Sequence, residues 1–120
     1  MKFAIAPTLA PLMGGQVVGV EDILTELKDL ESHYASGDCG VVEYSTIIKV
    51  TRMRLALASA TFGAESQQTK AVLQDLAFTM YMASRFDKRD NLWAESLKAY
   101  EMCGMGDCEY AMEARMQLIP

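Results

Sequence analysis

The chain has 120 residues, of which 51% are apolar and 22% are charged, and its formal net charge is −5 at pH 7. A chain of this length suits one domain and can bury roughly two thirds of its unfolded surface, so it needs no metal or disulfide to fold. The negative charge argues against a broad phosphate-binding surface, because nucleic-acid affinity depends on clustered Lys and Arg. No stretch approaches the ~18 uninterrupted apolar residues of a membrane span, so we expect no membrane insertion.

The N-terminal stretch differs in composition from the rest of the chain. Two prolines, Pro7 and Pro11, and three glycines interrupt its apolar run, so we predict an irregular arm over residues 1–19. The run superficially resembles a secretion signal, but the prolines break it and no A-x-A cleavage site is evident, so we do not expect secretion. Residues 20–120 are predicted to form a single helical-bundle domain.

The first predicted helix starts near residue 20 and stops at SGDCG, residues 36–40. Glu21 and Asp22 place negative charge at its start, where the helix dipole favours it. Apolar residues then recur at spacings of three and four, which is typical of an amphipathic helix. They are Val20, Ile23, Leu27, Leu30 and Tyr34.

A longer helix is predicted from about Val42 to Phe62, and it has the strongest periodic pattern in the chain. One face carries Tyr44, Ile48, Thr51, Leu55, Ala58 and Phe62. The opposite face carries Ser45, Lys49, Arg52 and Ala56, which can meet water. Gly63 ends this helix, and the short GAES connection favours an antiparallel hairpin with the helix that follows.

The next helix, over residues 69–86, has apolar residues on two sides. Its broad arc, the natural core face, contains Val72, Leu73, Leu76, Met80 and Ala83. Its second arc contains Ala71, Phe78 and Met82, with Tyr81 and Phe86 at the margins. Leaving Phe78 and Met82 in water would forgo about 1.5–3 kcal/mol for each side chain, so something should cover them.

Three occupants of the second arc are compatible with the sequence. The arm or the last helix can cover it within the chain, a second copy can cover it in a homodimer, or another protein can dock there. Nine methionines favour an adaptable surface, although methionine also fills gaps in cores. We therefore predict a partner-binding face made of Ala71, Phe78, Tyr81, Met82 and Phe86.

Two shorter helices complete the chain. The first, over about residues 92–102, places Trp93, Leu97 and Tyr100 on one face, and either Asp90 or Asn91 is expected to cap it. The last helix, with Asp107 as its expected cap, carries Cys108, Met112, Met116 and Ile119 at helical spacing. The predicted fold is therefore all-α, a compact bundle of about five helices.

No catalytic set is evident in the sequence. The one histidine, His33, would have to serve any nucleophilic triad, and no G-x-S-x-G motif is present. The E-x-x-H pattern of di-iron bundles is also missing. We therefore predict a protein that is not an enzyme and has no catalytic residues, no bound metal and no cofactor.

Three cysteines, Cys39, Cys103 and Cys108, make an odd number, which suits a reducing cytoplasm better than a disulfide framework. We expect partly buried, reduced thiols. A disulfide between Cys103 and Cys108 and a thiol-redox role stay open, although no Lys or Arg stands beside them in the sequence to lower a thiol pKa. A zinc site that adds His33 is disfavoured by its ligand spacing.

Basic residues form two small groups. The first contains Lys49, Arg52 and Arg54, and the second contains Arg85, Lys88 and Arg89. A helical hairpin would not join these groups into a continuous stripe, so we interpret them as solvated helix surface and do not expect nucleic-acid binding. A nucleic-acid-binding transcriptional regulator that uses both groups is the alternative hypothesis.

The leading functional hypothesis is a small cytoplasmic protein that docks on another protein as an adaptor, chaperone or inhibitor. An accessory protein of a phage, a mobile element or a secretion system would fit. The anionic first helix suits a partner with a basic surface, and self-association as a homodimer is the variant of this hypothesis. A small thiol-redox protein or another enzyme is the third hypothesis.

Overall fold

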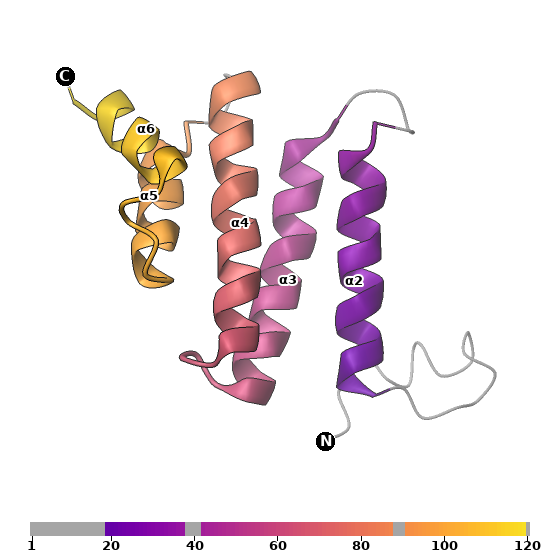
Figure 1. Ribbon diagram of the computed structural model, residues 1–120. Coiled ribbons are helices and arrows are strands. Elements are labelled where there is room, and N and C mark those ends of the chain that lie inside the picture. The colour runs from indigo at the N-terminus through magenta and orange to yellow at the C-terminus, as the bar shows by residue number, and fades with distance from the viewer. Residues whose placement is uncertain (1–18, 38–41, 88–90, 120) are drawn as a thin grey trace.

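The computed structural model describes residues 19–37, 42–87 and 91–119, and in these ranges it contains five α-helices and no strand. The helices are α2 (Val20–Ala35), α3 (Tyr44–Phe62), α4 (Gln67–Phe86), α5 (Trp93–Met102) and α6 (Glu109–Gln117) (Figure 1). The predicted all-α class and the number of helices are confirmed. The predicted arm lies outside the described residues except for Gly19, which caps α2. Among the described helices, none combines the length and the hydropathy that a membrane-spanning segment requires.

Each helix packs mainly on its neighbours in the chain. Figure 1 shows α2, α3 and α4 side by side, with α5 and α6 beyond α4. Helices α2 and α4 both pack against α3, and their backbones do not approach each other. The described helices leave several large apolar side chains exposed, among them Phe78, Phe86 and Met116.

The α3–α4 hairpin forms as the sequence predicts. Gly63 ends α3 with a φ of +93°, a backbone conformation that side chains with a Cβ disfavour. The Ser66 hydroxyl then caps α4 by accepting a hydrogen bond from the Thr69 amide at 3.1 Å. The Thr69 hydroxyl closes the turn by donating to the Gly63 carbonyl at 2.7 Å. These local bonds hold the two longest helices antiparallel.

Helix α4 is the centre of the core. All five residues of its predicted broad arc are buried, as expected. Toward α5 the helices approach closely through small residues, because Ala77 and Ala99 pack together and the buried Ser96 hydroxyl donates to the Ala77 carbonyl at 2.7 Å. On α3, the predicted polar face is exposed, and Ile48, Thr51 and Ala58 of the predicted core face are buried.

Several sequence-based expectations are wrong in detail. On α2 the predicted inward face holds for Ile23, which is buried, and for Val20, Leu27 and Tyr34, which are half-buried. The exception is Leu30, which is exposed while its neighbour Glu31 is buried. The expected cap of α6 was Asp107, but Cys108 occupies that position, where its sulfur accepts from the Ala111 amide.

The apolar face expected on α6 points to solvent. Met112, Met116 and Ile119 are exposed, and the buried face consists of Ala111 and Ala114, because only small side chains allow α6 to lie close against its neighbours.

At the start of α5 the expected side-chain cap is weak. Asn91 accepts only a 3.4 Å hydrogen bond from the Trp93 amide, and Asp90 lies outside the described residues.

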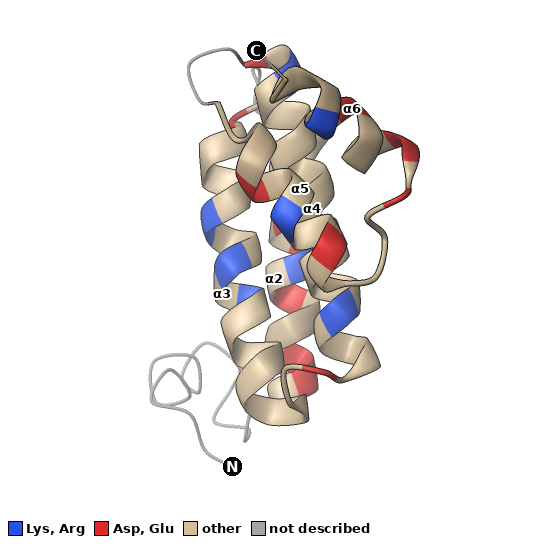
Figure 2. Cartoon of the chain, turned by 90° about the vertical axis from the view of Figure 1, so that its left-hand side faces the viewer, with Lys and Arg blue, Asp and Glu red and all other residues tan. Residues whose placement is uncertain are grey.

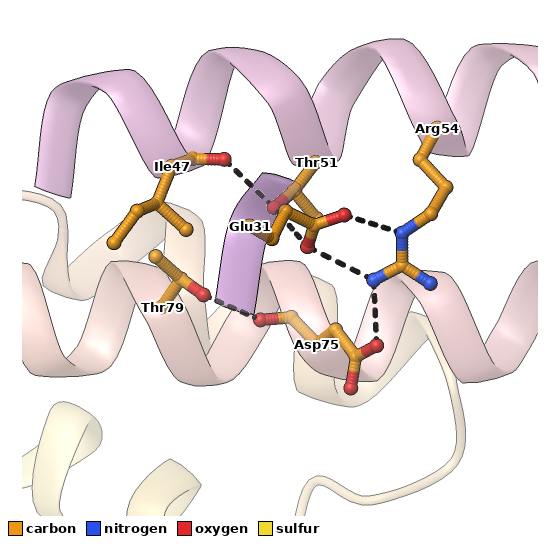
Figure 3. Close-up of polar contacts among 6 residues, drawn as sticks. All are labelled: Glu31, Ile47, Thr51, Arg54, Asp75 and Thr79. Atoms are coloured by element: carbon orange, nitrogen blue, oxygen red, sulfur yellow. Dashed lines mark hydrogen bonds and ion pairs between the residues drawn. The ribbon is translucent and has the colours of Figure 1, made fainter. Parts of the chain in front are cut away.

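A buried ionic network joins the three longest helices (Figure 3). Arg54 of α3, only 5% exposed, donates two hydrogen bonds to the carboxylate of Glu31 of α2 and one, of 2.7 Å, to Asp75 of α4. The Thr51 hydroxyl lies 2.6 Å from the same Glu31 carboxylate and 2.8 Å from the Ile47 carbonyl. The bidentate pairing satisfies the buried carboxylate.

Arg54 stays charged within this network. Burial alone would lower the pKa of Arg54, but its hydrogen bonds to Glu31 and Asp75, and the attraction of both carboxylates, raise the pKa above its ordinary value. Since a buried carboxylate without its cation is strongly unfavourable, the network fixes the register of α2 and α4 on α3.

We expect Arg54→Met to lower the free energy of unfolding by about 3–5 kcal/mol, because it leaves the Glu31 carboxylate buried without a cation. Urea denaturation followed by circular dichroism measures the loss. Arg52→Met, two residues away on the same helix, is the matched control. Arg52 makes an exposed ion pair with Glu95, so its loss should change stability by no more than about 0.5 kcal/mol. Equal losses in the two variants would contradict a structural role for the network.

Candidate functional site

A groove runs along α3 between α2 and α4, and we call it the α2–α4 groove. It consists of two hollows of about 400 and 280 Å³, and Lys28 and Arg54 line both of them. The first hollow has mainly apolar walls, formed by Leu24, Ala58, Phe62, Ala71 and Val72. The second is lined by residues that include Ala35, Ile47, Asp75 and Phe78. The groove exists because α2 and α4 both rest on α3 without closing over it.

Two residues of the predicted partner-binding face line this groove. Ala71 lies in the first hollow and Phe78 lies in the second, seven residues further along α4 and so on the same side of the helix. Both are exposed, and Phe78 keeps 40% of its surface accessible. The described part of the chain therefore covers the second apolar arc of α4 only in part.

The other three predicted residues have different surroundings. Tyr81 is only 4% exposed, which corrects the prediction of an accessible side chain: its ring packs between Trp93 of α5 and Tyr110 of α6, and its hydroxyl accepts a hydrogen bond from Arg85. Met82 is half-buried and lines neither hollow. Phe86 is exposed at the end of α4, where the Arg85 guanidinium lies over its ring.

The middle of the groove is polar. Lys28 is exposed and forms no ion pair with any residue in the described ranges. Asp75 lies opposite, with its side chain 46% exposed and one carboxylate oxygen bonded to Arg54. A ligand in the groove would therefore meet apolar surface in both hollows, Lys28 and Asp75 between them, and the exposed Glu21 at one end.

The basic residues that the structure describes do not form a continuous surface. In the view of Figure 2, the Lys and Arg positions are scattered among acidic ones over several helices. Arg54 is buried, which corrects its assignment to an accessible basic group, and Arg52 pairs with Glu95. In the second group Arg85 pairs with Glu113, while Lys88 and Arg89 lie outside the described residues. The regulator hypothesis gains no support from these positions.

The two described cysteines are free thiols on either side of the α5–α6 turn. Burial raises the pKa of Cys103, and the nearby positive charge of Lys70 on α4 opposes this shift only weakly. Lys70 is distant from the cysteines in the sequence, so its positive charge near Cys103 was not predicted. Within the described ranges, no group of three His, Cys, Asp or Glu side chains is placed to hold a metal ion. Cys39, the third cysteine, lies outside these ranges, and His33 is exposed near the end of α2.

We expect the Cys103 thiol to react with iodoacetamide several-fold more slowly in the folded chain than in urea, at about pH 8. The reactive form is the thiolate, and a raised pKa leaves less thiolate at a given pH. Mass spectrometry of the peptide that contains Cys103 measures the rate. The rate in the folded chain should also rise toward its plateau at higher pH than the rate in urea. An unchanged pH profile would contradict the raised pKa.

Comparison with protein-family models, with curated proteins and with solved structures gave no match for this chain. The geometry of the groove and of its surroundings therefore carries the functional argument.

Proposed function

We propose that this protein is a non-enzymatic interaction module of the cytoplasm that binds a helical segment of another protein in the α2–α4 groove. Adaptors, chaperones and inhibitors act in this way, by docking and not by chemistry. The observation that carries the proposal is the apolar strip formed by Ala71 and Phe78, which lies accessible on the wall of a groove between two helices.

The shape of the groove suits an α-helix. Two helices that rest side by side on a third leave a furrow, and a fourth helix in such a furrow gives the packing of a four-helix bundle. The residues of α2 that line the groove run from Glu21 to Ala35, which corresponds to a length of about 21 Å at 1.5 Å per residue. A partner helix of roughly 14 residues, about four turns, would span it.

The chemistry of the groove defines the partner helix further. Apolar side chains at helical spacing would contact Leu24, Phe62 and Phe78, while a polar residue near the middle would meet Lys28 and Asp75. Covering the accessible part of Phe78 alone would contribute roughly 2 kcal/mol of apolar transfer free energy. The polar middle would fix the register of the partner, because a shifted helix would place apolar groups against these charges.

Ala71→Glu tests the proposal, because it adds a charged side chain to an exposed helix position inside the first hollow without removing any buried group. We expect the variant to keep the circular dichroism spectrum of the natural chain and to lose the bound partner in affinity capture from the source cell. Met53→Glu is the matched control. Met53 is also exposed and apolar, but it lies on α3 outside both hollows, so this variant should retain the partner.

Two results would contradict a foreign partner. The first is a sedimentation equilibrium result in which the natural chain is a dimer and Ala71→Glu is a monomer. It would mean that a second copy of the chain occupies the groove. Retention of every captured protein by Ala71→Glu would show that the groove binds none of them.

A further inference from the structure

A second cavity lies on the other side of Phe78 from the α2–α4 groove, between α4 and the segment that joins α5 to α6. Its volume is about 400 Å³, which lies within the usual range of about 300–1,000 Å³ for small-ligand sites. Its walls include three aromatic side chains, Phe78, Tyr100 and Tyr110, and two carboxylates, Asp75 and Glu109. We call it the aromatic cavity.

The aromatic walls hold one another in place. The ring centroids of Phe78 and Tyr110 lie 5.2 Å apart in an edge-to-face arrangement, and those of Tyr100 and Tyr110 lie 6.2 Å apart with nearly parallel planes. Tyr81 supports the cluster from behind, with its centroid 4.9 Å from that of Tyr110. Because each ring contacts another, the faces of the cavity are set before any ligand enters.

The charge of the cavity has one sign. Asp75 and Glu109 bring two carboxylates, and none of the residues that line it is Lys, Arg or His. One carboxylate oxygen of Asp75 accepts a hydrogen bond from Arg54, while Glu109 forms no ion pair in the described ranges. A cation between aromatic faces is attracted by the ring quadrupoles, and these carboxylates add to that attraction.

Tyr100 supplies an independent sign of a ligand site. Its side chain is only 1% exposed, and its hydroxyl has no hydrogen-bond partner in the described part of the chain. Because no fully sealed polar side-chain atom of the described residues lacks a partner, this hydroxyl keeps a small solvent-accessible area, and Tyr100 lines the aromatic cavity. Burial raises the pKa of Tyr100, so its phenol stays protonated well above neutral pH. The oxygen of this hydroxyl can accept a hydrogen bond from an N–H donor.

We propose that the aromatic cavity binds an organic cation, an ammonium or guanidinium group on an alkyl stem, presented by a Lys or Arg side chain of a partner protein. Only the source of the cation rests on the proposed function, because the cavity itself does not depend on the α2–α4 groove. Both sites include Phe78 and Asp75, so one partner can place a helix in the groove and a basic side chain in the cavity.

The test uses N-acetyl-L-arginine amide as the probe and its neutral isostere, N-acetyl-L-citrulline amide, as the control. Titration of the full chain, followed by the aromatic NMR resonances of Tyr100 and Tyr110, should show saturable shifts with the arginine probe and none with the citrulline probe. Glu109→Gln should weaken arginine binding several-fold. Glu113→Gln, one helical turn further along α6 and outside the cavity, should leave it unchanged.

Three results would overturn the inference. The first is no saturable shift with arginine, and the second is an equal response to arginine and citrulline. The third is arginine binding combined with an affinity for the captured partner that Glu109→Gln leaves unchanged, which would mean that the partner supplies no cation to the cavity. Ala71 lines the groove and not the aromatic cavity, so Ala71→Glu should leave arginine binding intact. A failure of the cavity proposal can therefore be distinguished from a failure of the groove proposal.

Discussion

The fold depends on one guanidinium group held between two carboxylates. Arg54 leaves the middle of α3 and binds Glu31 of α2 and Asp75 of α4, two helices whose backbones do not pack together. The interior tolerates this charge only while its partners stay in position, since desolvated ions are expensive and their pairing depends on geometry. Sliding or rotation of either outer helix would break the pairing. The spacing of α2 and α4, and so the width of the groove between them, follows from this contact.

The same arrangement places α4 at the centre of the two proposed binding sites. One side of α4 is buried against α3 and α5, and the opposite side separates the α2–α4 groove from the aromatic cavity. Phe78 lines both the groove and the aromatic cavity, and Asp75, which lines both as well, binds Arg54 of the buried network. A ligand at either site would therefore contact Phe78 and Asp75, which also line the other site. One partner that occupies both sites would contact these two residues from both sides.

Local pattern was enough to predict most of the helices. The repeats in α3 and α4 identified the buried arc of α4 and the exposed face of α3, because side chains three and four residues apart always share a side of a helix. Gly63 marked the hairpin turn for an equally local reason. The second arc of α4 was also visible, since it needs only the positions of Ala71 and Phe78 on one cylinder.

The rest depended on contacts between distant residues. Arg54 looked like part of a basic surface, and its burial follows from Glu31, 23 residues earlier in the chain. A weak sign was present, because Arg54 lies at helical spacing from the buried Thr51 and Ala58. The aromatic cavity was not predicted, since it needs Phe78, Tyr100 and Tyr110 from three helices to meet. On α6 the bulky side chains suggested the inner face, but only alanines leave room for close packing there.

The order of the helices along the chain is also their order in space, and this has a kinetic consequence. Nearly all contacts between helices join consecutive segments, so the chain can fold through short loop closures, which lose the least chain entropy. Topologies dominated by such local contacts fold fast, within roughly microseconds to milliseconds. The bridge from Glu31 through Arg54 to Asp75 joins three helices and can close only after both flanking hairpins exist. The ionic contact that sets the final geometry is then also a late step, formed when the helices have already met.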